Sequence, residues 1–161
     1  MADTTDGAAQ ANEVAITDLL ARTSIHLGCS ATDWEAAVRQ VGDVLVAGGA
    51  ALPSYIDKMV EREHTISTFV GEGVAIPHGT LAGKDLVVRD ALCYLQFPDG
   101  VDWHGDEVTV CIGIAAGGNG HVPILAQLAE LLMDPDRAAA LRTASSVDEV
   151  LELMTPDPDD E

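Results

Sequence analysis

Residues 86–116 read LVVRDALCYLQFPDGVDWHGDEVTVCIGIAA, and this stretch decides the expected fold. It contains two β-rich segments, 86–97 and 108–116, and turn-forming residues follow them at 98–100 and 117–118. The link between the two segments is short, as it is in antiparallel strand pairs. We therefore expect these segments to pair antiparallel within one sheet.

Helical patterns occur on both sides of this stretch in the chain. Either Thr32 or Asp33 can cap a helix with an apolar stripe at helical spacing, and Gly48-Gly49 ends that helix. Because helices and strands interleave, the expected fold class is α/β: a single layered domain with a mixed, mainly parallel β-sheet flanked by helices on both faces. Further helices are expected to begin at Pro53, Gly120, Asp134 and Ser146.

Length and composition indicate one globular domain. The chain has 161 residues, 47% of them apolar, which is enough to bury a core. We expect a disordered leader at 1–12, a folded domain at 13–155 and a frayed acidic tail at 156–161. No apolar run of about 18 residues occurs and the first residues are polar, so we expect neither a membrane insertion nor a signal peptide. Three widely spaced cysteines without a CxxC pair indicate a reducing compartment, and we expect a cytoplasmic protein.

The charge is strongly negative and excludes two classes of partner. There are 27 acidic and 8 basic side chains, which gives a net charge of −19. Such a chain should avoid nucleic acid and anionic membranes, because both are polyanions. The acidity fits either a partner-binding face or adaptation to a cytoplasm of molar salt. The acids are spread from end to end, which favours salt adaptation.

Among the five histidines, His78 has the neighbours expected of a reactive side chain. In the segment GEGVAIPHGT (71–80) a short apolar strand ends at Pro77, which cannot continue a ladder. His78 then falls at the carboxyl edge of the sheet, where α/β proteins place ligands. An imidazole beside small residues suits nucleophilic attack on a bulky, charged electrophile. A tight turn explains the glycines and the proline equally well.

Longer strings make the chain resemble a known family over about residues 14–154. The chain is similar to enzyme IIA of the mannitol/fructose class of the phosphoenolpyruvate-dependent sugar phosphotransferase system. That resemblance implies an α/β domain with a mixed sheet flanked by helices. The strings that carry it are REHTIST (62–68), GEGVAIPHGT (71–80), QFPDGVDW (96–103), IGIAA (112–116), NGH (119–121) and SVDEVL (146–151).

The resemblance implies a catalytic set of three residues. His78 matches the phosphorylated histidine, Arg62 the arginine that steadies the phosphoryl group, and His121 a second active-site histidine at a helix start. A guanidinium can hold two equatorial oxygens at once, and a helix start favours negative charge. Because the donor is itself a phosphohistidine, the resemblance implies no cofactor and no metal. Two alternatives stay open: Arg62 forms a surface salt bridge with Glu61 or Asp57, and His121 has no role.

The implied activity is that of a phosphotransferase. His78 would accept phosphate from the histidine-containing phosphocarrier protein and pass it to a cysteine of a IIB component, for uptake of fructose or mannitol by a IIB/IIC permease. A regulatory alternative is a nitrogen-related IIA protein that signals by its phosphorylation state. A third possibility, a metal hydrolase, has no HExxH or facial-triad spacing behind it.

The other candidate side chains carry weaker signals. His64 follows Arg62 by two residues, so the two point to different faces of a helix. His104 lies in a polar loop that could bind a metal adventitiously. Cys93 and Cys111 lie in apolar β-rich runs and are expected in the core. Cys29 has no phosphate-binding loop before it, so we do not expect it to accept phosphate.

Overall fold

The computed structural model describes residues 16–117 and 121–155. The leader expected at 1–12 and the tail expected at 156–161 lie outside the described residues. The elements, in chain order, are η1 (Ile16–Leu19), β1 (Leu20–His26), α2 (Trp34–Ala47), α3 (Tyr55–Thr65), β2 (Phe69–Gly71), β3 (Val74–Ala75), η2 (Leu81–Leu86), β4 (Ala91–Trp103), β5 (Asp106–Ala115), α4 (His121–Leu132), α5 (Pro135–Arg142) and α6 (Val147–Met154).

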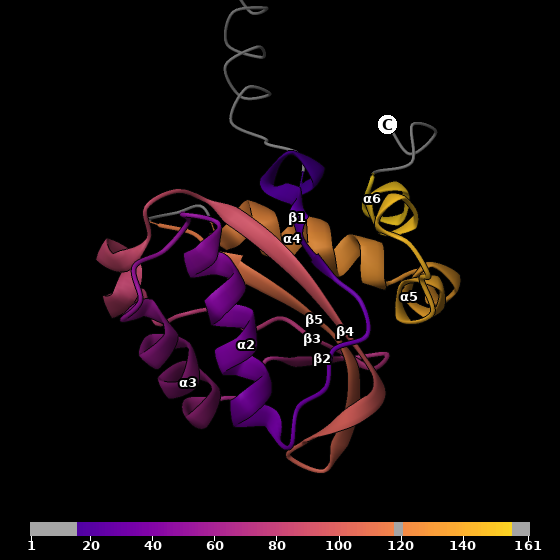
Figure 1. Cartoon of the computed structure of the whole chain (residues 1–161), viewed down its shortest axis with the longest axis horizontal. Helices are drawn as coiled ribbons and strands as arrows, with labels where there is room; N and C mark the ends of the chain where they lie inside the picture. Colours follow the sequence, from indigo (N-terminus) through magenta and orange to yellow (C-terminus); the bar gives the residue numbers. More distant parts are fainter. Residues whose placement is uncertain (1–15, 118–120, 156–161) are drawn as a thin grey trace, which may run out of the picture.

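Among the described residues, the strands form one five-stranded sheet in the order β1-β4-β5-β3-β2 (Figure 1). The β1–β4 and β3–β5 pairings are parallel, whereas the β4–β5 and β2–β3 pairings are antiparallel. The mixed α/β sheet is confirmed, and so is the antiparallel pair at its centre. Parallel pairings do not predominate, because short turns join both β2 to β3 and β4 to β5, and a short turn can only join antiparallel strands.

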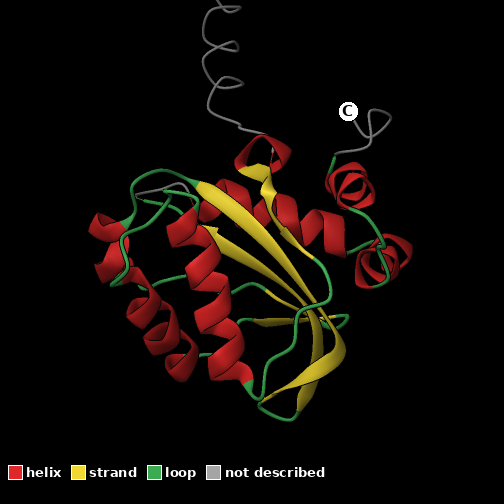
Figure 2. Ribbon diagram, in the orientation of Figure 1, coloured by secondary structure: helices red, strands yellow, loops and turns green. Residues whose placement is uncertain are grey.

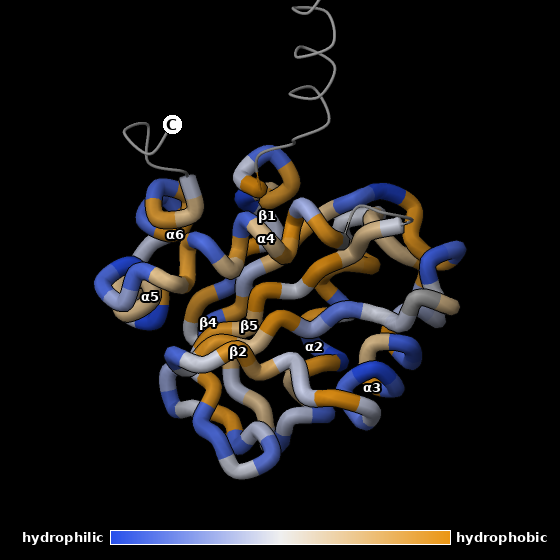
Figure 3. Tube along the Cα trace, turned by 180° about the vertical axis from the view of Figure 1, so that it is seen from behind, coloured by the Kyte–Doolittle hydropathy of each residue, from blue (hydrophilic) through white to orange (hydrophobic). Residues whose placement is uncertain are grey.

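Helices cover both faces of the sheet, as expected (Figure 2). On one face α2 and α3 pack over Cys93, Leu95 and Phe97 of β4. On the other face α4, α5 and α6 enclose a second apolar cluster, which includes Leu92 and Tyr94 of the same strand. The alternation along β4 therefore divides the core into two layers. Seen from behind, the hydrophobic parts of the chain follow the strands through the middle of the molecule (Figure 3).

Local capping signals fix the ends of several helices. Asp33 accepts a hydrogen bond from the Ala36 N–H at 2.8 Å, and α2 ends at Gly48, as the sequence predicts. Asp134 caps α5, and the Ser146 hydroxyl caps α6 by accepting from the Glu149 N–H at 3.1 Å. These predicted helix starts are confirmed.

The predicted turn at residues 98–100 is wrong, because β4 continues through them to Trp103. The register shifts between Gln96 and Val101, and Gly100 has a φ of +80° there, so the turn-forming residues make a bulge instead. The chain reverses at His104-Gly105, whose φ angles of +57° and +99° are those of a two-residue hairpin turn.

Two further differences concern strand ends. Residues 86–90 precede β4 instead of opening it, since η2 ends at Leu86 and β4 begins at Ala91. Strand β1 was not expected at all. It has the sequence LARTSIH, and only Leu20 and Ile25 in it are buried, because it pairs on one side only and lies at the edge of the sheet.

Candidate functional site

His78 lies just beyond the carboxyl end of β3. This strand pairs in parallel with β5, at Val74 with Val110 and at Ala75 with Cys111. The pairing reappears at His78, which forms an isolated parallel bridge with Ile114. The Ile114 N–H donates to the Pro77 carbonyl at 2.9 Å, which ties the histidine backbone to the central hairpin. The predicted strand-end placement of His78 is confirmed.

The ring of His78 is held in one tautomer. Its Nδ1 atom lies 2.8 Å from the carbonyl oxygen of Ile76. A carbonyl oxygen can only accept, so Nδ1 carries the hydrogen. The lone pair of the neutral imidazole is then on Nε2, and the ring is half-buried. This arrangement makes Nε2 the nucleophilic atom of the ring.

Tyr55 fixes the turn that follows His78, a role that no pattern in the sequence indicates. Its buried hydroxyl donates to the Ile114 carbonyl at 3.0 Å and accepts from the Gly79 N–H at 2.8 Å. Burial raises the pKa of Tyr55 to about 12, although the hydrogen bond from Gly79 acts in the opposite direction. A Cβ atom on Gly79 would lie 2.4 Å from the tyrosine ring, so this position requires glycine.

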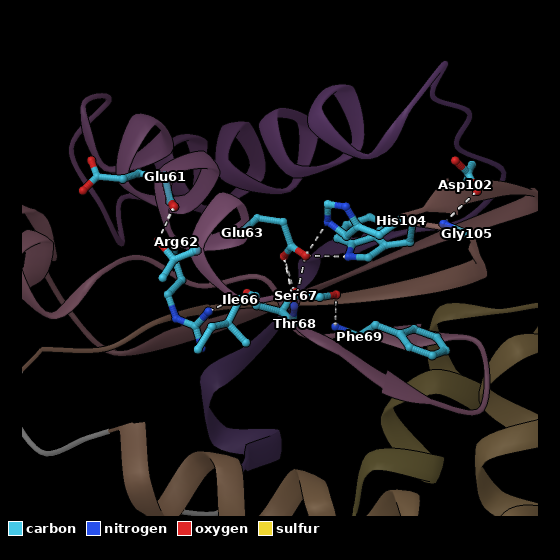
Figure 4. A network of polar contacts seen from close by, with 12 residues as sticks. Glu61, Arg62, Glu63, Ile66, Ser67, Thr68, Phe69, Asp102, His104 and Gly105 are labelled. Atoms are coloured by element: carbon cyan, nitrogen blue, oxygen red, sulfur yellow. Dashed lines mark hydrogen bonds and ion pairs between the residues drawn. The ribbon is translucent and has the colours of Figure 1, made fainter.

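Arg62 lies in the last turn of α3 and is partly exposed. Its Nη1 atom donates to the Ile66 carbonyl at 2.6 Å, and Figure 4 shows the side chain reaching that residue. The alternative pairing with Glu61 or Asp57 is wrong for the described residues. Glu61 pairs instead with Lys58 at 3.4 Å, and Asp57 pairs with Arg39 at 3.5 Å.

The carbonyl that binds Arg62 and the carbonyl that binds the His78 ring are linked through Thr68. Arg62 binds the carbonyl of Ile66, two residues before Thr68. The Thr68 carbonyl accepts from the Ile76 N–H at 3.0 Å, and the Ile76 carbonyl binds the His78 ring. The end of α3 and the segment leading to His78 are therefore held together by backbone contacts.

His121 is the first residue of α4, as the sequence predicts. Its side chain lies outside what the structure describes, so its role stays a prediction. Gly117, two residues after the end of β5, donates its N–H to the Asp90 carboxylate at 3.1 Å.

A buried carboxylate beside Arg62 was also missed by the sequence analysis. Glu63 is 2% exposed, and among the described residues it is the only buried acidic side chain. It accepts hydrogen bonds from Thr68 and from Trp103 Nε1, and it lies 3.2 Å from His104 Nε2 (Figure 4). Its partners are up to 41 residues away in sequence, so spacing alone could not reveal them.

The remaining candidates pack elsewhere, although His104 also contacts Glu63. The His64 ring packs edge-on against Trp34 with centroids 5.0 Å apart, and His104 packs against the same indole. Cys93 and Cys111 are buried, as expected, and burial raises the pKa of Cys93 to about 12. Burial also raises the pKa of Cys29, which is the opposite of what a reactive thiolate needs.

Neither a metal cluster nor a membrane span occurs in the described part of the chain. No group of three or more His, Cys, Asp and Glu side chains there is arranged to hold an ion. None of its helices is long and apolar enough to cross a membrane.

Residues 18–156 match the family described as phosphoenolpyruvate-dependent sugar phosphotransferase system, EIIA 2. The chain belongs to this EIIA family. It is an EIIA of the mannitol class and a phosphotransferase. One relative is the mannitol-specific phosphotransferase enzyme IIA component of Halalkalibacterium halodurans, 38% identical over 136 residues that cover 84% of this chain and 94% of the relative.

Solved structures agree with this assignment. In the Escherichia coli complex of enzyme IIAMTL and phosphorylated enzyme IIBMTL, one chain superposes on this EIIA with a TM-score of 0.80 at 37% identity, covering 84% of this chain and 98% of that one. Other relatives are longer. This chain is 38% identical over 140 residues to the mannitol-specific EIICBA component of Pasteurella multocida. The matched residues make up 84% of this chain but only 22% of that protein.

Proposed function

We propose that this EIIA accepts a phosphoryl group on Nε2 of His78 and passes it to a IIB component. The observation that carries the proposal is the 2.8 Å contact between His78 Nδ1 and the Ile76 carbonyl oxygen. That contact keeps the hydrogen on Nδ1 and the lone pair on Nε2. The ring lies at the carboxyl edge of a parallel strand pair, where α/β sheets bind their substrates.

The transfer needs no group beyond the two partner proteins. By the family resemblance, the donor is the phosphohistidine of the histidine-containing phosphocarrier protein. The Nε2 lone pair forms a bond to phosphorus while the donor's N–P bond breaks, and the donor imidazole leaves with that electron pair. In the second step the thiolate of a IIB cysteine attacks phosphorus, and Nε2 recovers its lone pair. Positioning and charge stabilisation supply most of the catalysis in such displacements.

Arg62 is proposed to hold the phosphoryl oxygens. A guanidinium carries five N–H donors and stays charged at any physiological pH. The contact with Ile66 uses Nη1 and fixes the direction of the side chain. The planar fork of donors matches the oxygens of a phosphoryl group.

His121 is proposed as the second histidine of the site. It begins α4, the next described element after β5, and β5 carries the Ile114 bridge to His78. The amino end of a helix carries a partial positive charge, which favours an anion there.

We propose a IIB protein as the acceptor, because the similar Escherichia coli chain is solved in complex with phosphorylated IIBMTL. The proposed role is in sugar uptake, with the protein in the cytoplasm. The names of the relatives favour mannitol over fructose. The nitrogen regulatory protein IIA-Ntr of Neisseria meningitidis is 23% identical, and that likeness extends to the fold alone. The transport role therefore has the stronger support.

Incubation with a labelled phosphohistidine donor tests the proposal. Wild type should take up acid-labile phosphate and release it to a IIB protein, His78→Ala should take up none, and Arg62→Ala should accept it slowly. Phosphate on His78→Ala would overturn the assignment of the acceptor. Uptake assays on a deletion strain with mannitol and with fructose then identify the sugar, and wild-type growth on both would favour the regulatory alternative.

A further inference from the structure

We infer that Glu63 is a positioning residue for phosphoryl transfer, holding both His78 and Arg62 through one buried carboxylate. This inference rests on the function proposed above, because it concerns how the reacting groups of that function are placed. Among the described residues, Glu63 has its polar contacts with Thr68, Trp103 and His104 and not with the two reacting side chains. It acts through Thr68 and through the backbone on either side of it.

The surroundings of Glu63 justify the burial of a charged group. A buried carboxylate is costly unless hydrogen bonds satisfy its oxygens. Oε1 accepts from the Thr68 hydroxyl at 2.5 Å, and Oε2 accepts from the Thr68 N–H at 3.0 Å and from Trp103 Nε1 at 2.8 Å. His104 Nε2 lies 3.2 Å from Oε2. One side chain of α3 thus joins the start of β2 to the tip of the β4–β5 hairpin (Figure 4).

The first connection runs from Glu63 to the His78 ring. Glu63 fixes Thr68 by both its N–H and its hydroxyl. The carbonyl of Thr68 then accepts from the Ile76 N–H at 3.0 Å. The carbonyl of Ile76 accepts from His78 Nδ1 at 2.8 Å. The Ile76 carbonyl selects the tautomer of His78, and its position depends on that of Thr68.

The second connection runs from Glu63 to Arg62. The two are neighbours in the last turn of α3, which ends at Thr65. Arg62 is anchored on the Ile66 carbonyl, and only one residue separates Ile66 from Thr68. Glu63 holds Thr68, and a shift of Thr68 would move the nearby Ile66 carbonyl that binds the Arg62 guanidinium. Both reacting groups depend on the same carboxylate.

Two substitutions separate hydrogen bonding from bulk. Glu63→Leu keeps a similar volume but leaves Thr68 and Trp103 without their acceptor. Glu63→Gln keeps an acceptor oxygen for Trp103 and for the Thr68 N–H, and its amide can donate to the Thr68 hydroxyl. We expect kcat for phosphoryl acceptance to fall about tenfold or more in Glu63→Leu, with KM for the donor little changed, because small misplacements of reacting groups cost this much. Glu63→Gln should stay within about threefold of wild type.

A matched control removes a buried polar group elsewhere. Gln96 is 7% exposed, and its amide donates to the Ala144 carbonyl at 2.9 Å and the Arg142 carbonyl at 3.2 Å. Those contacts tie β4 to α5 and to the residues after it, and they are separate from the described hydrogen bonds that lead from Thr68 to the His78 ring. Gln96→Leu should lose stability and keep its kcat. If Glu63→Leu does not fold, Thr68→Val removes one hydrogen bond to the carboxylate and should lower kcat in the same direction.

The experiment measures kcat and KM with a phosphohistidine donor, together with the ¹⁵N shifts of the His78 ring in the unphosphorylated full-length chain. Glu63→Leu should move those shifts from a single Nδ1–H tautomer toward a mixture, and Gln96→Leu should not. Wild-type kcat and ring shifts in folded Glu63→Leu would overturn the inference, as would an equal loss of kcat in Gln96→Leu or in Glu63→Gln. If wild type accepted no phosphate, the proposed function would fail, while the ring shifts would still test the link from Glu63 to His78.

Discussion

Tyr55→Phe removes one oxygen atom that two backbone groups beside His78 share. The hydroxyl accepts from the Gly79 N–H at 2.8 Å and donates to the Ile114 carbonyl at 3.0 Å. The phenylalanine ring can occupy the same space against Gly79, so the variant tests the hydroxyl alone. We expect the turn after His78 to loosen and phosphoryl transfer to slow.

The size of the effect follows from the two hydrogen bonds. A buried donor that loses its partner costs about 1–3 kcal/mol, and an ordinary hydrogen bond contributes about 0.5–1.5 kcal/mol. Direct pairing of Gly79 with the Ile114 carbonyl can recover part of the loss, so we expect about 2 kcal/mol of lost stability. In a chain of this length that lowers the melting temperature by roughly 4–8 °C. Transfer to His78 should slow by roughly three- to tenfold.

Tyr94→Phe provides the matched control. Tyr94 is equally buried, donates to the Leu141 carbonyl and accepts from Gln96 Nε2 at 3.3 Å, on the opposite face of the sheet. Urea unfolding should show a similar loss of stability in both variants at unchanged m. Only Tyr55→Phe should slow the uptake of labelled phosphate. A wild-type rate in Tyr55→Phe, or the same slowing in Tyr94→Phe, would refute the role assigned to this hydroxyl.

Three further predictions concern the fold and the charge. Burial raises the pKa of Tyr55 and of Tyr94 to about 12, so their phenolate absorbance should appear near that pH in the folded protein. Because an unfolded tyrosine ionises near pH 10, the stability of the fold should fall as the pH rises from about 10 toward 12. Titration near pH 10 without unfolding would contradict this. Gly113→Ala places a Cβ atom 2.2 Å from Val41 and 2.7 Å from Cys93 Sγ. It should lower the free energy of unfolding in urea by about 1–3 kcal/mol, and an unchanged value would mean that α2 is free to move. With a net charge of −19, phosphorylation of His78 should be faster at about 1 M salt than at about 50 mM, and the reverse trend with the fold intact would end the salt-adapted interpretation.

The parts of the fold that were predictable depend on local chemistry. The caps at Asp33, Asp134 and Ser146 act within three residues of themselves, so a pattern in the sequence is sufficient to locate them. The bulge at residues 98–100 has the same composition as a turn. Only the partner strand, where Val101 pairs with Val108, decides between the two.

The site divides in the same way. His78 is marked by Pro77 and by the glycines around it, all within a few residues. Tyr55 binds Gly79 and Ile114, which are 24 and 59 residues away in sequence. Glu63 binds Thr68, five residues away, and Trp103, 40 residues away, and no local pattern distinguishes it or Tyr55 from ordinary core and surface positions. Their roles come from tertiary contacts.

The most direct test of the central claim is the ring-nitrogen NMR spectrum of His78 before and after phosphorylation. We predict a neutral ring with hydrogen on Nδ1 beforehand, and a phosphoryl group on Nε2 afterwards with the Nδ1–H contact to Ile76 retained. Phosphate on Nδ1, or on any residue other than His78, would contradict the account.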